Sequence, residues 1–366
     1  EDYLKRIETY IKIDKVVAIT GVRRSGKSTL MRQYAAELVK NGVSRKNILF
    51  VNFEDPNLTE GNLELLIKIY EAYREIIKPK GKPYIFLDEI QHVEKWEKFV
   101  RSLNEKNEAH LIVSGSNSEI LSDEYSTVLT GRQLVVHVYP FSFREYLLSK
   151  GIEIENNSEG FTSQEELRIH FRDYLEFGGF PELTNLDDKN LKVRLVNSYV
   201  NDIIQKDIIK RHNIRKFQQL NNLIDYYVQN YSNPITFTKI EKFINLDVKT
   251  IQEYSHYFQN SNLIFFLKRF SHGYKEHIKS YRKLYLVDVG ISLRGMLEGS
   301  SNLGRRLENI VAIKFKRFEE LHPSANVFYW KEQYGKREVD FVIKEGRKVT
   351  KLFQVCLQLD NEKTKN

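Results

Sequence analysis

The sequence is poor in cysteine, methionine and tryptophan, and it contains no long apolar run. Its 366 residues include one cysteine (Cys356), two methionines and two tryptophans. One thiol cannot form a disulfide framework or a cysteine zinc site within a chain, so a reducing cytoplasmic location is the simplest expectation. No apolar stretch approaches the roughly 18 residues that a membrane-spanning helix needs, and no signal peptide is recognisable. These absences argue against a disulfide-stapled secreted domain and against an integral membrane protein.

The composition is that of a folded protein with an uneven charge. Hydrophobic residues make up 41% of the chain, and its length predicts two or three domains. The formal net charge is +8. Residues 1–200 carry 28 Lys and Arg against 31 Asp and Glu, whereas residues 201–366 carry 29 against 18. A basic excess in the second half favours binding of nucleic acid there, with a lysine-rich solvated surface as the alternative.

An apolar segment at residues 16–20 leads into a loop that two glycines bracket and that ends in Gly-Lys-Ser. This is the P-loop pattern. Gly21 and Gly26 let backbone N–H groups turn towards a polyphosphate, Lys27 reaches its outer phosphates, and the Ser28 hydroxyl is placed to ligate Mg²⁺. The following helix adds the positive end of its dipole. The predicted nucleotide-binding residues here are Gly21, Val22, Arg23, Arg24, Ser25, Gly26, Lys27, Ser28 and Thr29.

A second apolar run, at residues 84–90, contains the acidic pair Asp88 and Glu89. Such a run predicts a buried parallel strand whose carboxyl end meets a ligand. We expect Asp88 to hold Mg²⁺ directly or through water, and Glu89 to act as the base that orients or deprotonates the attacking water.

A third strand, predicted at residues 110–113, ends in small polar residues. Ser116 or Asn117 is the candidate for sensing the γ-phosphate and the lytic water, and the alternative is that these residues cap the next helix. Two more strands are expected at residues 48–51 and 134–138. Along the chain, the predicted strands alternate with amphipathic helices. The predicted fold class is therefore α/β, with a mainly parallel sheet covered on both faces.

Six motifs in order make the chain resemble the archaeal ATPase family of AAA+ type, with an ORC/Cdc6-like or STAND-like core. They are Gly-Val-Arg-Arg-Ser-Gly-Lys-Ser (21–28), Phe-Leu-Asp-Glu-Ile-Gln (86–91), Val-Ser-Gly-Ser-Asn-Ser (113–118), Leu-Thr-Gly-Arg (129–132), Pro-Phe-Ser-Phe-Arg-Glu (140–145) and Gly-Gly-Phe-Pro-Glu (178–182). The resemblance implies a P-loop ATPase that binds ATP or ADP with Mg²⁺ and hydrolyses ATP. It also implies a core at residues 1–155, a helical lid at 156–231, a winged helix-turn-helix at 232–295 and a small nuclease-like domain at 296–366.

The same resemblance suggests two further nucleotide contacts. Arg132 stands where an arginine finger would act on a neighbouring subunit's nucleotide in a homo-oligomer, and the alternative is a surface arginine in a β-turn. Pro181, in the turn at residues 178–181, would help to close the lid over adenine or ribose. An ordinary turn between helices is the alternative for this segment.

Residues 235–244 and 247–258 have the outline of a helix-turn-helix. Asp247 is expected to cap the second helix, with strands at 263–270 and 283–287 forming the wing. Such a module binds DNA in some proteins and serves as a protein interface in others, and both readings stay open.

The C-terminal segment is similar to the PD-(D/E)XK nuclease fold, in which acidic groups hold a divalent metal. Glu308 on a helix and Asp340 on a strand form a second candidate metal site. Gln354 stands where glutamate is expected and Cys356 where the catalytic lysine is expected, which argues against nuclease activity. An inactive docking module is the alternative, and we expect this domain to be degenerate and truncated in the given sequence.

The leading functional hypothesis is an ATPase that couples its nucleotide state to the winged-helix and nuclease-like modules, acting on DNA. A slow nucleotide switch that serves as a binding or scaffolding protein is the first alternative. An ATP-regulated nuclease is the second.

Overall fold

The computed structural model describes residues 3–58, 61–116, 131–152, 164–271, 281–294, 302–332 and 337–357. The chain separates into two compact units, residues 1–139 and 140–366. The domain boundaries predicted after residues 155, 231 and 295 remain predictions. Among the described helices, none has the length and apolar character needed to cross a membrane.

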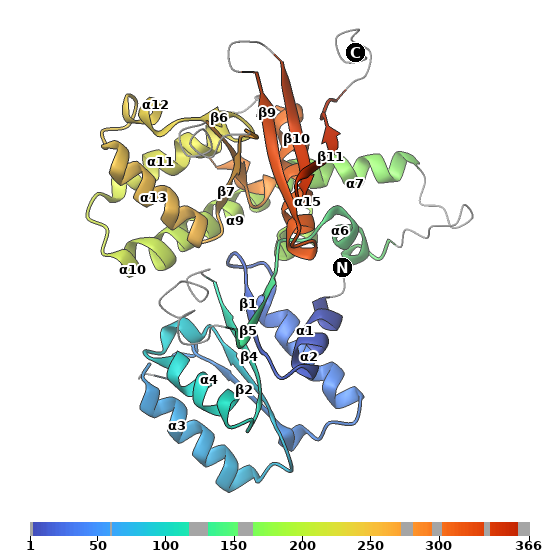
Figure 1. The fold of residues 1–366 in the computed structure, drawn as a ribbon, viewed down its shortest axis with the longest axis vertical. Coiled ribbons are helices and arrows are strands. Elements are labelled where there is room, and N and C mark those ends of the chain that lie inside the picture. The colour runs from blue at the N-terminus through green and yellow to red at the C-terminus, as the bar shows by residue number, and fades with distance from the viewer. Residues whose placement is uncertain are drawn as a thin grey trace. The chain divides into compact units, whose positions relative to one another are not determined.

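The first unit is built on a five-stranded parallel sheet with strand order β2-β3-β4-β1-β5 (Figure 1). Its strands are β1 (Val16–Thr20), β2 (Ile48–Asn52), β3 (Tyr84–Asp88), β4 (His110–Gly115) and β5 (Gln133–His137). The P-loop strand β1 lies between β4 and β5, and every neighbouring pair runs parallel. The predicted parallel α/β sheet is confirmed.

Helices cover both faces of this sheet. They are α1 (Tyr3–Lys12), α2 (Lys27–Lys40), α3 (Leu63–Ala72) and α4 (Trp96–Glu105), with the short turns η1 (Arg45–Asn47), η2 (Tyr73–Ile77) and η3 (Ile90–His92). Because successive side chains of a strand point to opposite faces, Val17 and Ile19 pack with α1 and α2. Val16 and Ala18 pack with α3 and α4 on the other face. The central strand is therefore buried on both sides and holds the loop that follows it in a fixed place.

The second unit begins with a series of helices. These are α6 (Phe143–Ser149), α7 (Gln164–Phe177), α8 (Pro181–Thr184), α9 (Lys189–Asp202), the π-helical η5 (Ile203–Ile209), α10 (Lys210–His212) and α11 (Phe217–Asn230). Helix α7 ends just before Gly178, and α8 begins at Pro181. The φ of Gly178 is 77°, in the left-handed region that glycine tolerates. The break predicted at residues 178–181 is thus present.

A small three-stranded sheet follows, with strand order β6-β8-β7. Its elements are β6 (Pro234–Ile235), α12 (Phe237–Glu241), α13 (Val248–Asn260), β7 (Ile264–Lys268) and β8 (Arg282–Leu286), followed by η6 (Val289–Leu293). The side chain of Asp247 accepts a hydrogen bond from the Thr250 N–H at 3.0 Å, which confirms the predicted helix cap. The helix expected at residues 235–244 is shorter than predicted, because Ile235 pairs with Arg282 in the sheet.

The chain continues into α15 (Leu303–Leu321) and an antiparallel sheet of β9 (Ala325–Lys331), β10 (Glu338–Glu345) and β11 (Lys348–Phe353), in the order β11-β10-β9. Leu267 of β7 and Tyr285 of β8 pack in one apolar core with Ala312, Tyr329 and Phe341 from these elements. The small sheet and the C-terminal helix and strands therefore share a core.

Candidate functional site

The loop between β1 and α2 has a positive φ at two glycines, a backbone conformation that favours glycine. Gly21 has a φ of 142°, and a Cβ atom there would lie 2.1 Å from the Val138 carbonyl oxygen. Gly26 has a φ of 100° and immediately precedes α2. Since L side chains rarely adopt these conformations, the two glycines shape the loop as the sequence predicted.

Lys27 is the first residue of α2, and its side chain is only 3% exposed. Its Nζ donates hydrogen bonds to the carbonyl oxygens of Gly21 at 3.0 Å and Val22 at 3.2 Å. The same atom lies 3.7 Å from Oε1 of Glu89. The loop lysine and the predicted catalytic glutamate therefore face each other at the carboxyl edge of the sheet.

Asp88 and Glu89 are linked by a residue that the sequence did not single out. The Ser114 hydroxyl donates to Oδ1 of Asp88 at 2.5 Å, and its oxygen accepts the Glu89 N–H at 3.0 Å. All three residues are buried. Ser114 thus fixes the orientation of the predicted Mg²⁺ ligand and the backbone of the predicted base.

The carboxylate of Glu89 is held by neighbours on two elements. Its Oε2 accepts hydrogen bonds from Gln91 Nε2 at 2.5 Å and from the Ser116 N–H at 3.3 Å. Burial acts to raise the pKa of Glu89, but the Lys27 charge and the Gln91 hydrogen bond, helped by the charges of Arg23 and His92, outweigh it and leave that pKa below its usual value. Glu89 is therefore ionised at neutral pH. Ser116 lies beside Glu89, and its predicted role as the γ-phosphate sensor remains a prediction. Asn117, the other candidate, lies outside the described residues.

Arg23, one of the predicted nucleotide-binding residues, forms an outer group with Glu54 and His92, which sequence reasoning missed. Arg23 donates to Oε1 of Glu54 at 2.6 Å, and Nε2 of His92 lies 4.0 Å from the same oxygen. Ligand atoms of Glu54, Glu89 and His92 lie within 4.8 Å of one another, close enough for a metal ion. Glu54 stands two residues after the end of β2, and this position was the available signal, since β2 and β3 end at the same edge of the sheet.

The residues at this edge fit a magnesium polyphosphate. The buried hydroxyl oxygens of Thr20 and Ser25 have no hydrogen-bond partner, so polar groups beside the loop are left for a ligand to satisfy. The hydroxyl of Ser28 and the carboxylate of Asp88 are oxygen ligands of the kind that Mg²⁺ prefers. Val22 is buried, whereas Arg24 is exposed on the loop and Thr29 is exposed in the first turn of α2.

Comparisons with known proteins agree with this geometry. Residues 13–147 match the family model of an AAA domain, and residues 168–300 match a domain of unknown function, DUF8612. The chain is 34% identical over 361 residues to an uncharacterized protein of Methanocaldococcus jannaschii, covering 97% of this chain and 77% of that protein. This chain belongs to the same family.

An uncharacterized protein of Haemophilus influenzae is 30% identical over 328 residues, which cover 87% of this chain and 78% of that protein. Among solved structures, Cdc6p from Pyrobaculum aerophilum is similar over 86% of this chain and 93% of that chain, at 12% identity and a TM-score of 0.34. The AAA-domain match and the parallel sheet are what place the first unit among α/β AAA-type domains.

Arg132 lies apart from the glycine loop of the AAA domain, and Pro181 is in the other compact unit. Arg132 precedes β5 beside Val16, at the end of β1 opposite to the loop, about 13 Å away along the strand. It forms an exposed ion pair with Glu105 at 3.0 Å. Pro181 is the first residue of α8 and belongs to the other compact unit. Their roles as arginine finger and lid contact remain predictions.

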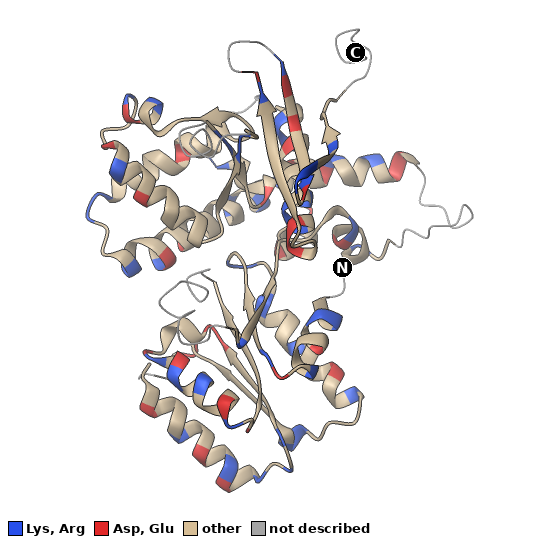
Figure 2. Cartoon of the chain, viewed as in Figure 1, with Lys and Arg blue, Asp and Glu red and all other residues tan. Residues whose placement is uncertain are grey.

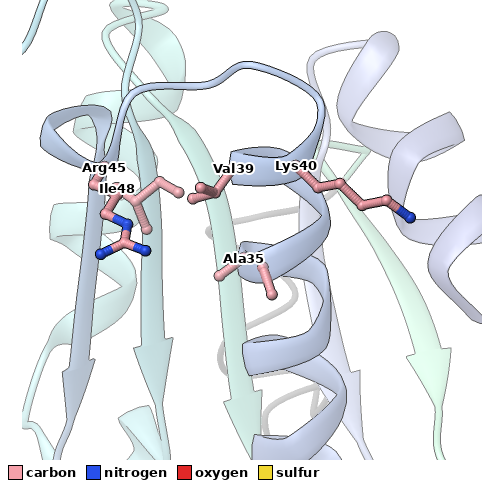
Figure 3. Close-up of a pocket in the computed structure, with 6 residues that line it drawn as sticks. Ala35, Val39, Lys40, Arg45 and Ile48 are labelled. Atoms are coloured by element: carbon pink, nitrogen blue, oxygen red, sulfur yellow. The ribbon is translucent and has the colours of Figure 1, made fainter.

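A hollow of about 500 Å³ in the AAA domain is a separate feature. It is lined by Ala35, Ala36, Val39, Lys40, Arg45 and Ile48 (Figure 3). Helix α2 has 14 residues and is about 20 Å long, and the hollow lies at its C-terminal half, whereas the glycine loop adjoins its N-terminus. The hollow is therefore not part of the candidate nucleotide site.

Proposed function

We propose that this protein is an ATPase of AAA+ type that binds ATP with Mg²⁺ in the loop at residues 21–29. The observation that carries the proposal is the approach of Lys27 Nζ to within 3.7 Å of Glu89, at the end of the central strands. A cation for the outer phosphates and an ionised carboxylate for the attacking water are the two groups that phosphoryl transfer to water needs from the protein.

Lys27 now donates to two carbonyl oxygens of its own loop. Phosphate oxygens carry charge and accept stronger hydrogen bonds than neutral carbonyls, so a bound triphosphate would draw the ammonium outward. Mg²⁺, held by Ser28 and Asp88, would neutralise charge on the phosphate oxygens. Glu89, fixed by Gln91 and the Ser116 N–H, would orient the water or take its proton.

We propose DNA as the partner of the second unit. Helices α12 and α13 with the β6-β8-β7 sheet have the element order of a winged helix-turn-helix, in which the second helix enters the major groove. Lys249, Gln252 and His256 are exposed on α13. Figure 2 shows further basic positions near α10 and along β11. These features and the basic excess of residues 201–366 support electrostatic attraction to phosphates.

The alternative function, a nucleotide switch that works as a scaffold, would use the same AAA domain. The two hypotheses predict different responses to DNA. An ATPase acting on DNA should hydrolyse ATP faster when duplex DNA is added. A switch should retain ADP tightly and ignore DNA.

The deciding experiment measures the ATPase rate and the particle mass with and without double-stranded DNA. We expect the rate to rise with DNA, Lys27→Ala to lose ATP binding or hydrolysis, and Glu89→Gln to bind ATP with turnover reduced about 100-fold. Normal turnover by Glu89→Gln would refute the assignment of the base. An unchanged rate with DNA would favour the switch.

A further inference from the structure

The ammonium group of Lys283 lies at the centre of three carboxylates in the second unit. Lys283 is on β8, and its side chain is 2% exposed. Its Nζ lies 3.0 Å from Oε1 of Glu308, 2.6 Å from Oε1 of Glu338 and 2.9 Å from Oδ1 of Asp340. An ammonium has three N–H donors and no acceptor, so three carboxylate oxygens can satisfy it completely.

The carboxylates have further partners. Tyr285 donates its hydroxyl to Oε1 of Glu308 at 2.7 Å, and Lys331 donates to Oε2 of Glu338 at 2.9 Å. Oδ2 of Asp340 accepts the Val355 N–H at 2.9 Å. Each acidic group is therefore held by Lys283 and by one more donor, as buried charges require.

This arrangement does not fit the divalent metal that Glu308 and Asp340 were predicted to hold. A divalent cation needs several oxygen ligands with free lone pairs, and a positive charge already stands where these carboxylates converge. The amide oxygen of Gln354, in the place expected for a third acid, accepts from the Asp340 N–H at 3.4 Å. Among the described residues, the trio with metal-ligand spacing is Glu54, Glu89 and His92 in the other unit.

We propose that Lys283 is the resident cation of the Glu308, Glu338 and Asp340 cluster, in place of a divalent metal ion, and that the cluster joins β8 to α15 and β10. The cluster therefore has a structural role, and the C-terminal module does not cut phosphodiester bonds. With three carboxylate oxygens within 3.0 Å of Nζ, each N–H of the ammonium has a charged acceptor.

The first test measures Mn²⁺ binding to the full chain without nucleotide by isothermal titration, comparing the wild type with Asp340→Asn. We expect no difference between them, because any Mn²⁺ bound at the AAA domain is common to both. Supercoiled plasmid incubated with Mn²⁺ should stay uncut. Mn²⁺ binding or plasmid cleavage by the wild type that is lost in Asp340→Asn would overturn the proposal.

The second test removes the ammonium group by Lys283→Met. Methionine fills the space of the aliphatic part of the lysine side chain and leaves only the volume of Nζ empty. Uncompensated buried carboxylates should lower Tm by about 10 °C. Mn²⁺ should restore Tm and bind at one additional site per chain, and Lys283→Met/Asp340→Asn should abolish that gain. An unchanged Tm without any gain of Mn²⁺ binding would also overturn the proposal.

Two further variants serve as a control and as a rescue for this test. Lys331→Met removes an ammonium that touches Glu338 from a half-exposed position, so it should change Tm little and gain no Mn²⁺ site. If Lys283→Met does not fold, the variant that adds Glu308→Gln and Asp340→Asn to it should fold again, because the uncompensated charge is then reduced. Failure of this rescue would mean that Lys283 is needed for packing rather than as a cation, and the proposal would be wrong.

Discussion

The hydroxyl of Ser114 donates a hydrogen bond to Oδ1 of Asp88 at 2.5 Å, while its oxygen accepts the N–H of Glu89. One side chain on β4 therefore positions two consecutive acids at the end of β3. This relationship leads to the first prediction.

Ser114→Ala should lower the ATPase rate about 10-fold or more, because removing a hydrogen bond that orients a metal ligand costs 10- to 100-fold in activity or metal affinity. The Mg²⁺ concentration that gives half-maximal activity should rise, while binding of ATP without metal should change little. Ser102→Ala, on α4, is the control and should behave as the wild type. Wild-type Mg²⁺ dependence in Ser114→Ala would show that Asp88 needs no such support.

Gly21→Ala should abolish ATP binding. A Cβ atom at this position would lie 2.1 Å from the Val138 carbonyl oxygen, so the loop must move. Titration with a non-hydrolysable ATP analogue measures the loss. The matched control is Gly42→Ala, at a φ of 92° with no atom within 4 Å of the added Cβ. It should cost about 1 kcal/mol of stability from backbone strain and leave ATP binding intact.

Arg132→Ala should leave the stability of the protein nearly unchanged, because its ion pair with Glu105 is exposed to solvent. If Arg132 completes a neighbouring subunit's site, the ATPase rate should fall by about 1000-fold, and mixing with Lys27→Ala should restore activity. Arg101→Ala removes the other arginine on Glu105 and is the control. Without restoration in the mixture, a local structural role for Arg132 would be favoured.

Asp288 should make stability depend on pH. Burial raises the pKa of Asp288 to about 6 from its usual 3.8, although the Gly179 and Gly290 N–H groups donate to its carboxylate. Between these pH values the folded protein keeps a proton that the unfolded chain has released. The contribution of Asp288 to stability is therefore greatest below pH 3.8 and declines as the pH rises to about 6.

Asp288→Asn removes this titration. The free energy of unfolding of the variant, relative to the wild type, should rise by about 2 kcal/mol between pH 4 and pH 7. Urea unfolding at both pH values measures it, with the exposed Asp187→Asn as the control. An equal difference between Asp288→Asn and the wild type at both pH values would contradict the prediction.

The AAA domain could be predicted because its signals are local. An apolar strand, a glycine loop and an amphipathic helix follow one another at residues 16–40, and β1 is buried on both faces. The acids at the end of β3 were found for the same reason. Ser114 was missed because the sequence offers several serines there, and only the strand register, which pairs Leu87 with Val113, places Ser114 beside Asp88.

The remaining contacts join residues far apart in the sequence, which no local pattern reveals. Lys283 meets Asp340 across 57 positions, and Asp288 meets Gly179 across 109. Lys283 directly precedes the apolar residues 284–287, and this was a warning that a partner must exist, since a buried ammonium needs a counter-charge. The sequence alone could not say which acids would supply it.

The packing of Leu267 and Tyr285 against Tyr329 and Phe341 has a consequence for how this protein can be dissected. A fragment that starts at residue 302 would expose the rings of Tyr329 and Phe341 to water. It would also lack Lys283, the partner of three of its acids. Such a fragment should aggregate or be degraded when expressed by itself, whereas one that starts before α11 keeps the shared interior whole.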